Sequence, residues 1–420
     1  MDIVSRVQRD AFRYFERTVN PANGLVADNT RPGSHASIAA VGFALSCYAV
    51  GAERGFMPRA EATRRSLTAL RFFRDSPQGE APDTSGYRGF YYHFLDMHSG
   101  RRAWKCELSL VDSAILIAGM LTAGQYFDGD SEGEAETREL AEMLYARADW
   151  KWALNDGLAI SHGWKPECGF LRYGWEGYSE AILLYVLALG SPGSSLTEDS
   201  YRAWTSTYQW ENLYGRDLLY SGPLFVHQLS HAWIDFRGIR DPFMRAKHSD
   251  YFENSRQAVR LQWEYAVQNP RGFRGYGSRS WGLSACDGPG PATQHFDGRD
   301  QRFLGYAARG VPYGPDDGTL APAAAAASLP FAPDLVLPAL EHLYEAAPEA
   351  ATELGFKCFN LSFPSAGRHG WISPASFAID QGAVVLMIEN HRSSFLWELL
   401  RRNRHLARGL RRAGFRGGWL

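Results

Sequence analysis

Residues 169–192 read GFLRYGWEGYSEAILLYVLALGSP, and the two halves of this stretch differ in character. The first half is a loop of glycines and aromatic residues, whereas an almost unbroken apolar run follows Glu180 and stops at Gly190 and Pro192, which commonly end a helix. A helix that is apolar on every side must be buried on every side, so this stretch predicts a helix at the centre of a domain. Glu176 and Glu180 lie at the N-terminal end of this helix, and they would share one face if the helix begins early enough.

A second stretch of the same design comes earlier in the chain. Residues 87–128 read YRGFYYHFLDMHSGRRAWKCELSLVDSAILIAGMLTAGQYFD, which is an aromatic loop with a glycine, then Glu107 and Asp112, then the apolar run 114–121. Two loops therefore lead acidic residues onto two buried helices. We expect this pair to organise the functional site.

Apolar and charged helical patterns alternate along the whole sequence. Each of six apolar segments is followed by a more polar helical segment, and strand-like alternation is confined to short pieces. This pattern predicts an all-α fold, an (α/α)6 toroid or barrel with long active-site loops, in a single domain over residues 1–420. The six apolar segments are 34–50, 107–127, 179–189, 223–236, 319–328 and 373–388.

Composition excludes several function classes. The 44 basic and 46 acidic residues give a net charge of −2, so nucleic-acid binding has no electrostatic support. No apolar segment approaches the length of a membrane span, and the N-terminus is charged and amphipathic, which predicts a cytoplasmic protein, or a periplasmic one if a leader was removed. The five cysteines are widely spread and are expected to be reduced.

The loops that enter the apolar helices are rich in aromatic rings and acids, which is typical of surfaces that bind sugars. Cleaving a glycosidic bond requires two carboxyl groups, one protonated and one ionised. An acid at the mouth of a buried helix loses water contact and stays protonated near neutral pH. Glu107 and Glu180 fit this description best and are predicted to be catalytic; the alternative is that both only favour the helix dipole.

Further acids, aromatic residues, one arginine and one histidine are predicted to contact substrate. Asp112 and Asp380 lie within apolar runs and could instead be structural, and Asp287 could cap a turn. His227 and His231 have metal-ligand spacing but no third ligand, which favours packing or a sugar contact. No metal and no cofactor are expected. The predicted substrate-binding residues are Arg88, Phe90, Tyr91, Asp112, Trp175, Glu176, Tyr178, His231, Trp281, Asp287, Trp371 and Asp380.

Several long strings identify a family. GFYYHFLD at 89–96, ELSLVDSAIL at 107–116, GWEGYSEAILLYVLALGSP at 174–192, GPLFVHQLSHAWIDFRGIRD at 222–241 and GTLAPAAAAASLPFAP at 318–333 carry the resemblance, with the shorter SGRR, GLSACDGP and KCFNLSF. They resemble the glycoamylase-like family of bacterial β-1,2-glucanases, glycoside hydrolase family 144, and the related catalytic domain of cyclic β-1,2-glucan synthases. The resemblance extends over nearly the whole chain.

This resemblance implies an (α/α)6 fold and a glycoside hydrolase that cleaves β-1,2-glucan or its oligosaccharides. Glu107 and Glu180 match the positions of acids that are expected to matter in the family. Two alternatives stay open: a cyclising transglycosylase on the same substrate, and an inactive glycan-binding protein on the same fold. Endo or exo action and inversion or retention depend on loop height and carboxylate separation, so the sequence does not decide them.

Overall fold

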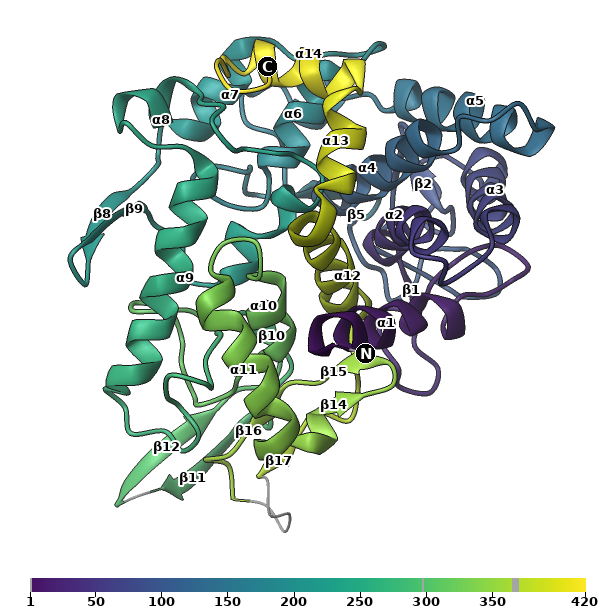
Figure 1. Cartoon of the computed structure of the whole chain (residues 1–420). Helices are drawn as coiled ribbons and strands as arrows, with labels where there is room; N and C mark the ends of the chain where they lie inside the picture. Colours follow the sequence, from purple (N-terminus) through teal and green to yellow (C-terminus); the bar gives the residue numbers. More distant parts are fainter. Residues whose placement is uncertain (1, 297, 365–369) are drawn as a thin grey trace.

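The structure is a computed structural model that describes residues 2–296, 298–364 and 370–420. It is mainly α-helical, with 45% of the chain in helices and only short strands, so the all-α prediction is confirmed (Figure 1). The apolar helices are α2 (Ile38–Glu53), α4 (Leu110–Tyr126), α6 (Ile182–Gly190), α10 (Pro322–Ala327) and α12 (Ala378–Ser393). The other helices are α1 (Ile3–Arg17), α3 (Arg59–Asp75), α5 (Glu132–Arg147), α7 (Glu198–Thr205), α8 (Pro242–Ala246), α9 (Tyr251–Gln268), α11 (Pro333–Ala346), α13 (Phe395–Arg401) and α14 (Arg404–Arg412).

The apolar helices form the centre of the molecule. Every residue of α6 is buried, as its uniformly apolar sequence predicts. Helices α2 and α4 approach closely because glycines face each other: a Cβ on Gly42 would lie 2.4 Å from the carbonyl oxygen of Ile115, and a Cβ on Gly119 would lie 2.1 Å from that of Gly42. The main cluster of buried apolar residues runs from Val7 to Phe415.

One predicted helix is wrong. Residues 223–236 form two 3₁₀ helices, η2 (Leu224–His227) and η3 (Leu229–Ala232), in place of one α-helix. The backbone closes i to i+3 bonds here, from the amide of Gln228 to the carbonyl of Phe225 and from the amide of His231 to the carbonyl of Gln228. Gln228 also donates from its side chain to Ala324 and Ser328 of the neighbouring segment, which holds this tighter path in place.

Short antiparallel strands line the loops between helices. One three-stranded sheet joins β5, β6 and β7, and the other strands pair in twos. Two further 3₁₀ helices are η1 (Trp152–Leu154) and η4 (Pro348–Ala350). The strands are β1 (Ala36–Ser37), β2 (Gly86–Tyr87), β3 (Phe90–Tyr91), β4 (Phe94–Leu95), β5 (Leu108–Ser109), β6 (Gly163–Lys165), β7 (Gly169–Phe170), β8 (Trp210–Leu213), β9 (Arg216–Leu219), β10 (Ala285–Cys286), β11 (Ala292–Phe296), β12 (Arg299–Phe303), β13 (Ala307–Ala308), β14 (Ala351–Thr352), β15 (Gly355–Phe356), β16 (Phe359–Asn360) and β17 (Trp371–Ile372).

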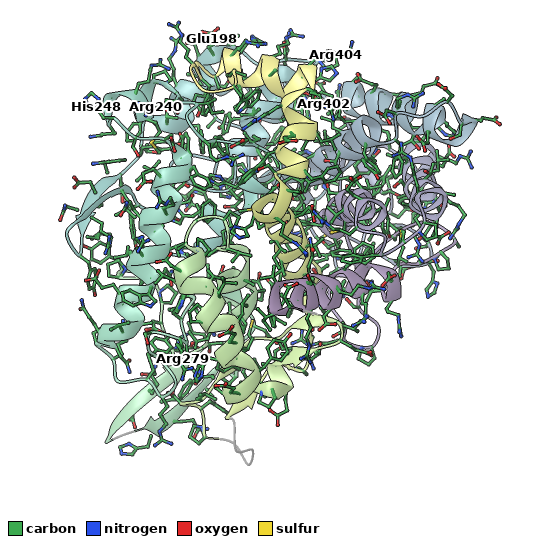
Figure 2. The ribbon with its side chains drawn as sticks, viewed as in Figure 1. Glu198, Arg240, His248, Arg279, Arg402 and Arg404 are labelled. Atoms are coloured by element: carbon green, nitrogen blue, oxygen red, sulfur yellow. The ribbon has the colours of Figure 1, made fainter. Side chains whose placement is uncertain are left out.

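Side chains cover the ribbon densely, and the labelled arginines Arg240, Arg279, Arg402 and Arg404 are exposed at the outer surface (Figure 2). All five cysteines are free, as expected, and only Cys168 is exposed. Of the helices in the described ranges, none combines the length and the apolar character that a membrane crossing requires.

Candidate active site

A cavity of about 440 Å³ opens where the apolar helices and the 3₁₀ pair converge. Its wall is built from separate parts of the sequence: the loops before α4 and α6, the η2–η3 pair, the loop around β10, and the apolar helices α10 and α12. Five of the predicted site residues line it together, in agreement with the expectation that the two acid-bearing loops meet. They are Glu107, Asp112, Trp175, Glu180 and Asp380.

Glu107 and Glu180 both stand just before their helices rather than within them. Helix α4 begins at Leu110 and α6 at Ile182, so neither acid is part of the first helical turn. The idea that Glu176 and Glu180 share one helix face is therefore wrong, because both precede the helix. Neither Glu107 nor Glu180 therefore lies in the first helical turn, where the dipole effect is strongest.

The backbone around Glu107 is fixed by strand pairing and by a glycine. Strand β5 pairs with β6, and Ser109 caps α4 by accepting a hydrogen bond from the amide of Asp112. A Cβ on Gly163 would lie 2.6 Å from the carbonyl oxygen of Leu108 and 3.1 Å from the Cγ of Glu107. A side chain at Gly163 would thus displace the Glu107 side chain from the cavity wall.

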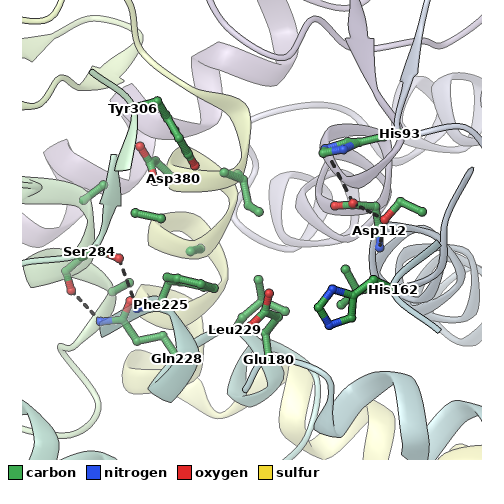
Figure 3. Close-up of a pocket in the computed structure, with 18 of the residues that line it drawn as sticks. His93, Asp112, His162, Glu180, Phe225, Gln228, Leu229, Ser284, Tyr306 and Asp380 are labelled. Atoms are coloured by element: carbon green, nitrogen blue, oxygen red, sulfur yellow. Dashed lines mark hydrogen bonds and ion pairs between the residues drawn. The ribbon is translucent and has the colours of Figure 1, made fainter. Parts of the chain in front are cut away.

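His93 lies between Glu107 and Asp112 on this side of the cavity, and Figure 3 shows its ring next to Asp112. Its Nδ1 lies 2.9 Å from Oε1 of Glu107, and its Nε2 lies 3.6 Å from Oδ2 of Asp112. Burial opposes a charge on the ring, but the negative charge of Asp112 and the hydrogen bond and charge of Glu107 outweigh it and raise the pKa of His93 to about 9. His93 is therefore an imidazolium at neutral pH.

This positive charge keeps Glu107 ionised. Burial alone would raise the pKa of the Glu107 carboxyl, but the hydrogen bond and charge of His93 outweigh burial and lower it below its ordinary value. Glu107 is thus a carboxylate that already has a charged partner, contrary to the expectation that it is a protonated acid.

Glu180 has the opposite character. Burial, with a smaller contribution from the negative charge of Asp112, raises the pKa of the Glu180 carboxyl to about 7, although a bond from its own backbone amide opposes the shift. Ser230 fixes its backbone, since the Ser230 hydroxyl donates to the Glu180 carbonyl at 3.1 Å and accepts from the amide of Leu183 at 3.2 Å. The sequence-based expectation of a desolvated acid agrees with this geometry.

Asp380 faces the cavity from the opposite wall, in the first turn of α12 (Figure 3). Burial and the negative charge of Asp28 raise the pKa of the Asp380 carboxyl to about 7. Within the described residues, the carboxyls of Glu180 and Asp380 accept no hydrogen bond from another side chain. Both are therefore available to a substrate.

Further lining residues were not predicted from the sequence. His162 packs its ring 4.3 Å from that of Trp175, and Tyr306 is 63% exposed next to Asp380. Gln228 and Ser284 contribute polar groups on the same side as Tyr306. His93 belongs to the string GFYYHFLD, which was noted in the sequence. Its contact with Glu107 depends on the fold and could not be predicted from that string.

The remaining predicted contacts do not line the cavity. Some are held in hydrogen bonds or ion pairs elsewhere. Arg88 lies 3.6 Å from Asp149, and Asp287 pairs with Arg31 and accepts a bond from the Ser373 hydroxyl. Glu176 is exposed on the loop before α6.

The aromatic and histidine residues in this group pack against the protein itself. Tyr91 donates to the carbonyl of Phe73, and Tyr178 lies 3.3 Å from Nδ1 of His227. His231 is buried with its Nε2 3.0 Å from the hydroxyl of Ser255. Phe90 and Trp281 are buried in the core, and Trp371 belongs to β17, where it pairs with Asn360.

Neither His227 nor His231 is part of a metal site in the part of the chain that the structure describes, where no cluster of three or more potential ligands occurs. His227 Nε2 lies 3.1 Å from the carbonyl oxygen of Ser221. Burial lowers the pKa of His227 to about 4 and that of His231 to about 3, so both rings are neutral packing groups.

Comparisons with known proteins point to one family. The family described as "Glycoamylase: Putative glucoamylase" matches residues 172–404. A curated relative from Parabacteroides distasonis, named "Exo beta-1,2-glucooligosaccharide sophorohydrolase (non-reducing end)", is 27% identical over 98% of this chain. The chain spans 57% of the length of that relative.

Solved structures give the same picture. A "putative glucoamylase" from Bacteroides uniformis superimposes with a TM-score of 0.87 at 30% identity, over 100% of this chain and 98% of the other. An endo-β-1,2-glucanase from Chitinophaga pinensis, in complex with sophorotriose and glucose, gives 0.85 at 25% identity, over 100% and 99% of the two chains. An endo-β-1,2-glucanase from Talaromyces funiculosus gives 0.69 at 12% identity over 97% of this chain and 90% of the other, which shows a shared fold alone.

Proposed function

The chain belongs to the Glycoamylase family, and from that premise we propose that it is a glycoside hydrolase of β-1,2-linked glucan or its oligosaccharides. The observation that carries this proposal is the pair of carboxyls, Glu180 and Asp380, that face one cavity, accept no hydrogen bond from another side chain among the described residues, and titrate near neutral pH. Glycosidic cleavage requires two such groups. The linkage is taken from the names of the β-1,2-glucan enzymes among the relatives.

The proposed architecture is an (α/α)6 toroid in a single domain over residues 1–420. Six inner elements support it: the five apolar helices and the η2–η3 pair. Each is followed along the chain by a further helix, in the order α3, α5, α7, α9, α11 and α13. In such an arrangement the loops at one end of the inner elements converge on a central cavity.

We assign the general acid to Glu180. A carboxyl whose pKa lies at about 7 holds its proton through the acidic range and releases it near neutrality, which suits protonation of a leaving glycosidic oxygen. Its lack of a side-chain partner leaves the proton free to be donated to a substrate. The aromatic ring of Trp175 in the same wall gives a surface for a sugar ring.

We assign the second catalytic role to Asp380 and not to Glu107. Glu107 forms an ion pair with His93, which lowers its basicity, whereas Asp380 has a raised pKa and faces Glu180 from the opposite wall. A carboxylate in that position can take a proton from a water molecule that attacks the anomeric carbon, while Glu180 protonates the departing oxygen. Glu107 and Asp112 then hold His93 as a fixed positive group on the cavity wall.

The test is incubation with linear β-1,2-glucan, alongside β-1,3-, β-1,4- and α-1,4-glucans, with products resolved by chain length and anomer. Turnover of the β-1,2-linked chains alone is expected. Preferred cleavage of starch would overturn the substrate, cyclic products would indicate a transglycosylase, and binding without turnover would indicate a glycan-binding protein. Because both catalytic groups are carboxyls, EDTA should leave the rate unchanged.

A further inference from the structure

Trp104 is an exposed tryptophan at the tip of a tight turn. Its side chain is 66% exposed, and the amide of Cys106 donates to the carbonyl of Ala103 at 3.0 Å to close the turn. Trp104 and Lys105 have φ angles of 52° and 53°, so both central residues are left-handed, as in a type I′ turn. Asparagine and glycine are the usual residues there. Backbone preference and the hydrophobic effect therefore both oppose a tryptophan at this position.

The turn is held by contacts that do not involve the tryptophan ring. The amide of Ala103 donates to the carbonyl of Phe94 at 3.0 Å, and Nε of Arg102 donates to the carbonyl of Cys106 at 2.6 Å. The Arg102 side chain is 1% exposed and pairs with Glu167 at 2.7 Å. The ring of Trp104 is thus presented from a rigid base and is not needed to build that base.

A short series of rings connects Trp104 to the cavity. The Trp104 ring lies edge-on to Phe94 at 5.2 Å, and Phe94 stacks on His93 at 3.9 Å with 15° between the planes. His93 and Glu107, three residues after Trp104, both line the cavity. The other neighbour of Trp104 is His35, at 4.3 Å. Trp104 is thus connected to the cavity lining through Phe94 and His93, and much of its own surface is open to solvent.

We propose that Trp104 is a stacking platform for a glucose unit of a chain that extends out of the cavity, away from the bond that is cleaved. The inference rests on the proposed function. Sugar rings present C–H faces that pack on aromatic rings, and a rigid ring keeps the ordering cost low. Only chains long enough to reach Trp104 make this contact, so the residue sets a preference for longer substrates.

The test compares Trp104→Asn and Trp104→Tyr with wild type on linear β-1,2-glucooligosaccharides of increasing length. For Trp104→Asn, kcat/KM should fall roughly 2- to 12-fold on the long chains, as expected for one lost aromatic contact. It should stay unchanged on the shortest chain that is cleaved. Trp104→Tyr should keep most of the preference. Since asparagine tolerates the left-handed backbone, the Tm of Trp104→Asn should equal or exceed that of wild type.

The control is Trp210→Ala. Trp210 is a half-buried tryptophan on β8, and β8 is well separated in Figure 1 from β5, the strand that follows Trp104. It should leave the length dependence of kcat/KM unchanged. An equal loss on all chain lengths, or a lowered Tm with Trp104→Asn, would show a structural role and overturn the platform. If the wild type is active and Trp104→Asn has the same length dependence of kcat/KM, the platform is overturned and the proposed function stands. A wild type that cleaves no β-1,2-linked chain overturns the proposed function as well.

Discussion

Replacing Glu180 by glutamine tests the acid and the electrostatics of the cavity in one variant. The raised pKa means that the folded protein keeps a proton on Glu180 at pH values where the unfolded chain has lost it. Between about 4.5 and about 7 the unfolded state binds fewer protons, so the stability of the wild type falls as pH rises. This loss is complete above the folded-state pKa of about 7.

The size of this stability change follows from the pKa shift of Glu180. A change from 4.5 to about 7 corresponds to about 3 kcal/mol, since each unit is worth about 1.4 kcal/mol. Glu180→Gln removes the ionisable group and with it the loss of stability at high pH. The cost of burying the new amide offsets part of this gain in stability. We expect the variant to be more stable than wild type at pH 8 by up to about 3 kcal/mol, and to show no such advantage at pH 4.

Activity should change in the opposite direction. Losing a general acid typically lowers kcat by about 10² to 10⁴, and the alkaline limb of the pH–rate profile near pH 7 should disappear. An activated aryl glycoside, whose leaving group needs no proton, should restore much of the rate. The assays are urea unfolding at pH 4 and pH 8 and steady-state kinetics between pH 4 and pH 9.

Glu176→Gln is the matched control, because it is the same substitution on an exposed residue of the same loop, and it should change neither stability nor rate by much. Near-normal turnover in Glu180→Gln would refute the acid assignment. A stability difference that does not depend on pH would refute the electrostatic reasoning, because that reasoning requires the gain to appear only as the wild-type acid ionises.

Two further variants test other parts of the site, and a third tests the buried ion pair between Arg309 and Asp317, which does not line the cavity. Asp380→Asn should lower kcat by about 10² or more and remove the acidic limb of the pH–rate profile, and wild-type products of retained anomeric configuration would exclude the base role. His93→Gln should destabilise the protein by up to about 3 kcal/mol below pH 6.5, with the loss shrinking as pH rises through about 9, where wild-type His93 also becomes neutral; urea unfolding across this range checks it. Arg309→Met leaves Asp317 buried without its partner, and thermal unfolding should show a loss of about 3 to 5 kcal/mol.

The sequence predicted the helical fold and the position of the acids better than their chemistry. Apolar runs identified the helices α2, α4, α6, α10 and α12, because burial keeps such residues from water. The failure at 223–236 has a physical cause: the polar side chains of this segment bond to Ser221, Ala324 and Ser328, and those contacts come from the tertiary fold.

Glu107 and Glu180 looked equivalent in the sequence and differ in the structure. Each follows an aromatic loop and precedes an apolar helix, so local pattern gives both the same environment. The difference is His93, whose ring reaches Glu107 because the loop between them folds back: the amide of His93 donates to the carbonyl of Glu107 at 2.9 Å, and Tyr92 pairs with Leu108. Because the contact between His93 and Glu107 depends on this backbone pairing, the spacing of the two residues in the sequence does not reveal it.

The aromatic residues show the same limit. Phe90, Tyr91 and Trp281 were predicted to contact sugar and are buried, whereas Trp104 and Tyr306 were not predicted and are exposed near the cavity. Composition cannot separate these two groups, since a ring in a glycine-bearing loop suits a core as well as a sugar. What separates them is backbone conformation and pairing. The left-handed turn at Trp104 lacks the Asn-Gly sequence by which such turns are recognised. The sequence around Trp104 therefore does not show that this residue is exposed, although our proposal gives it a contact with substrate.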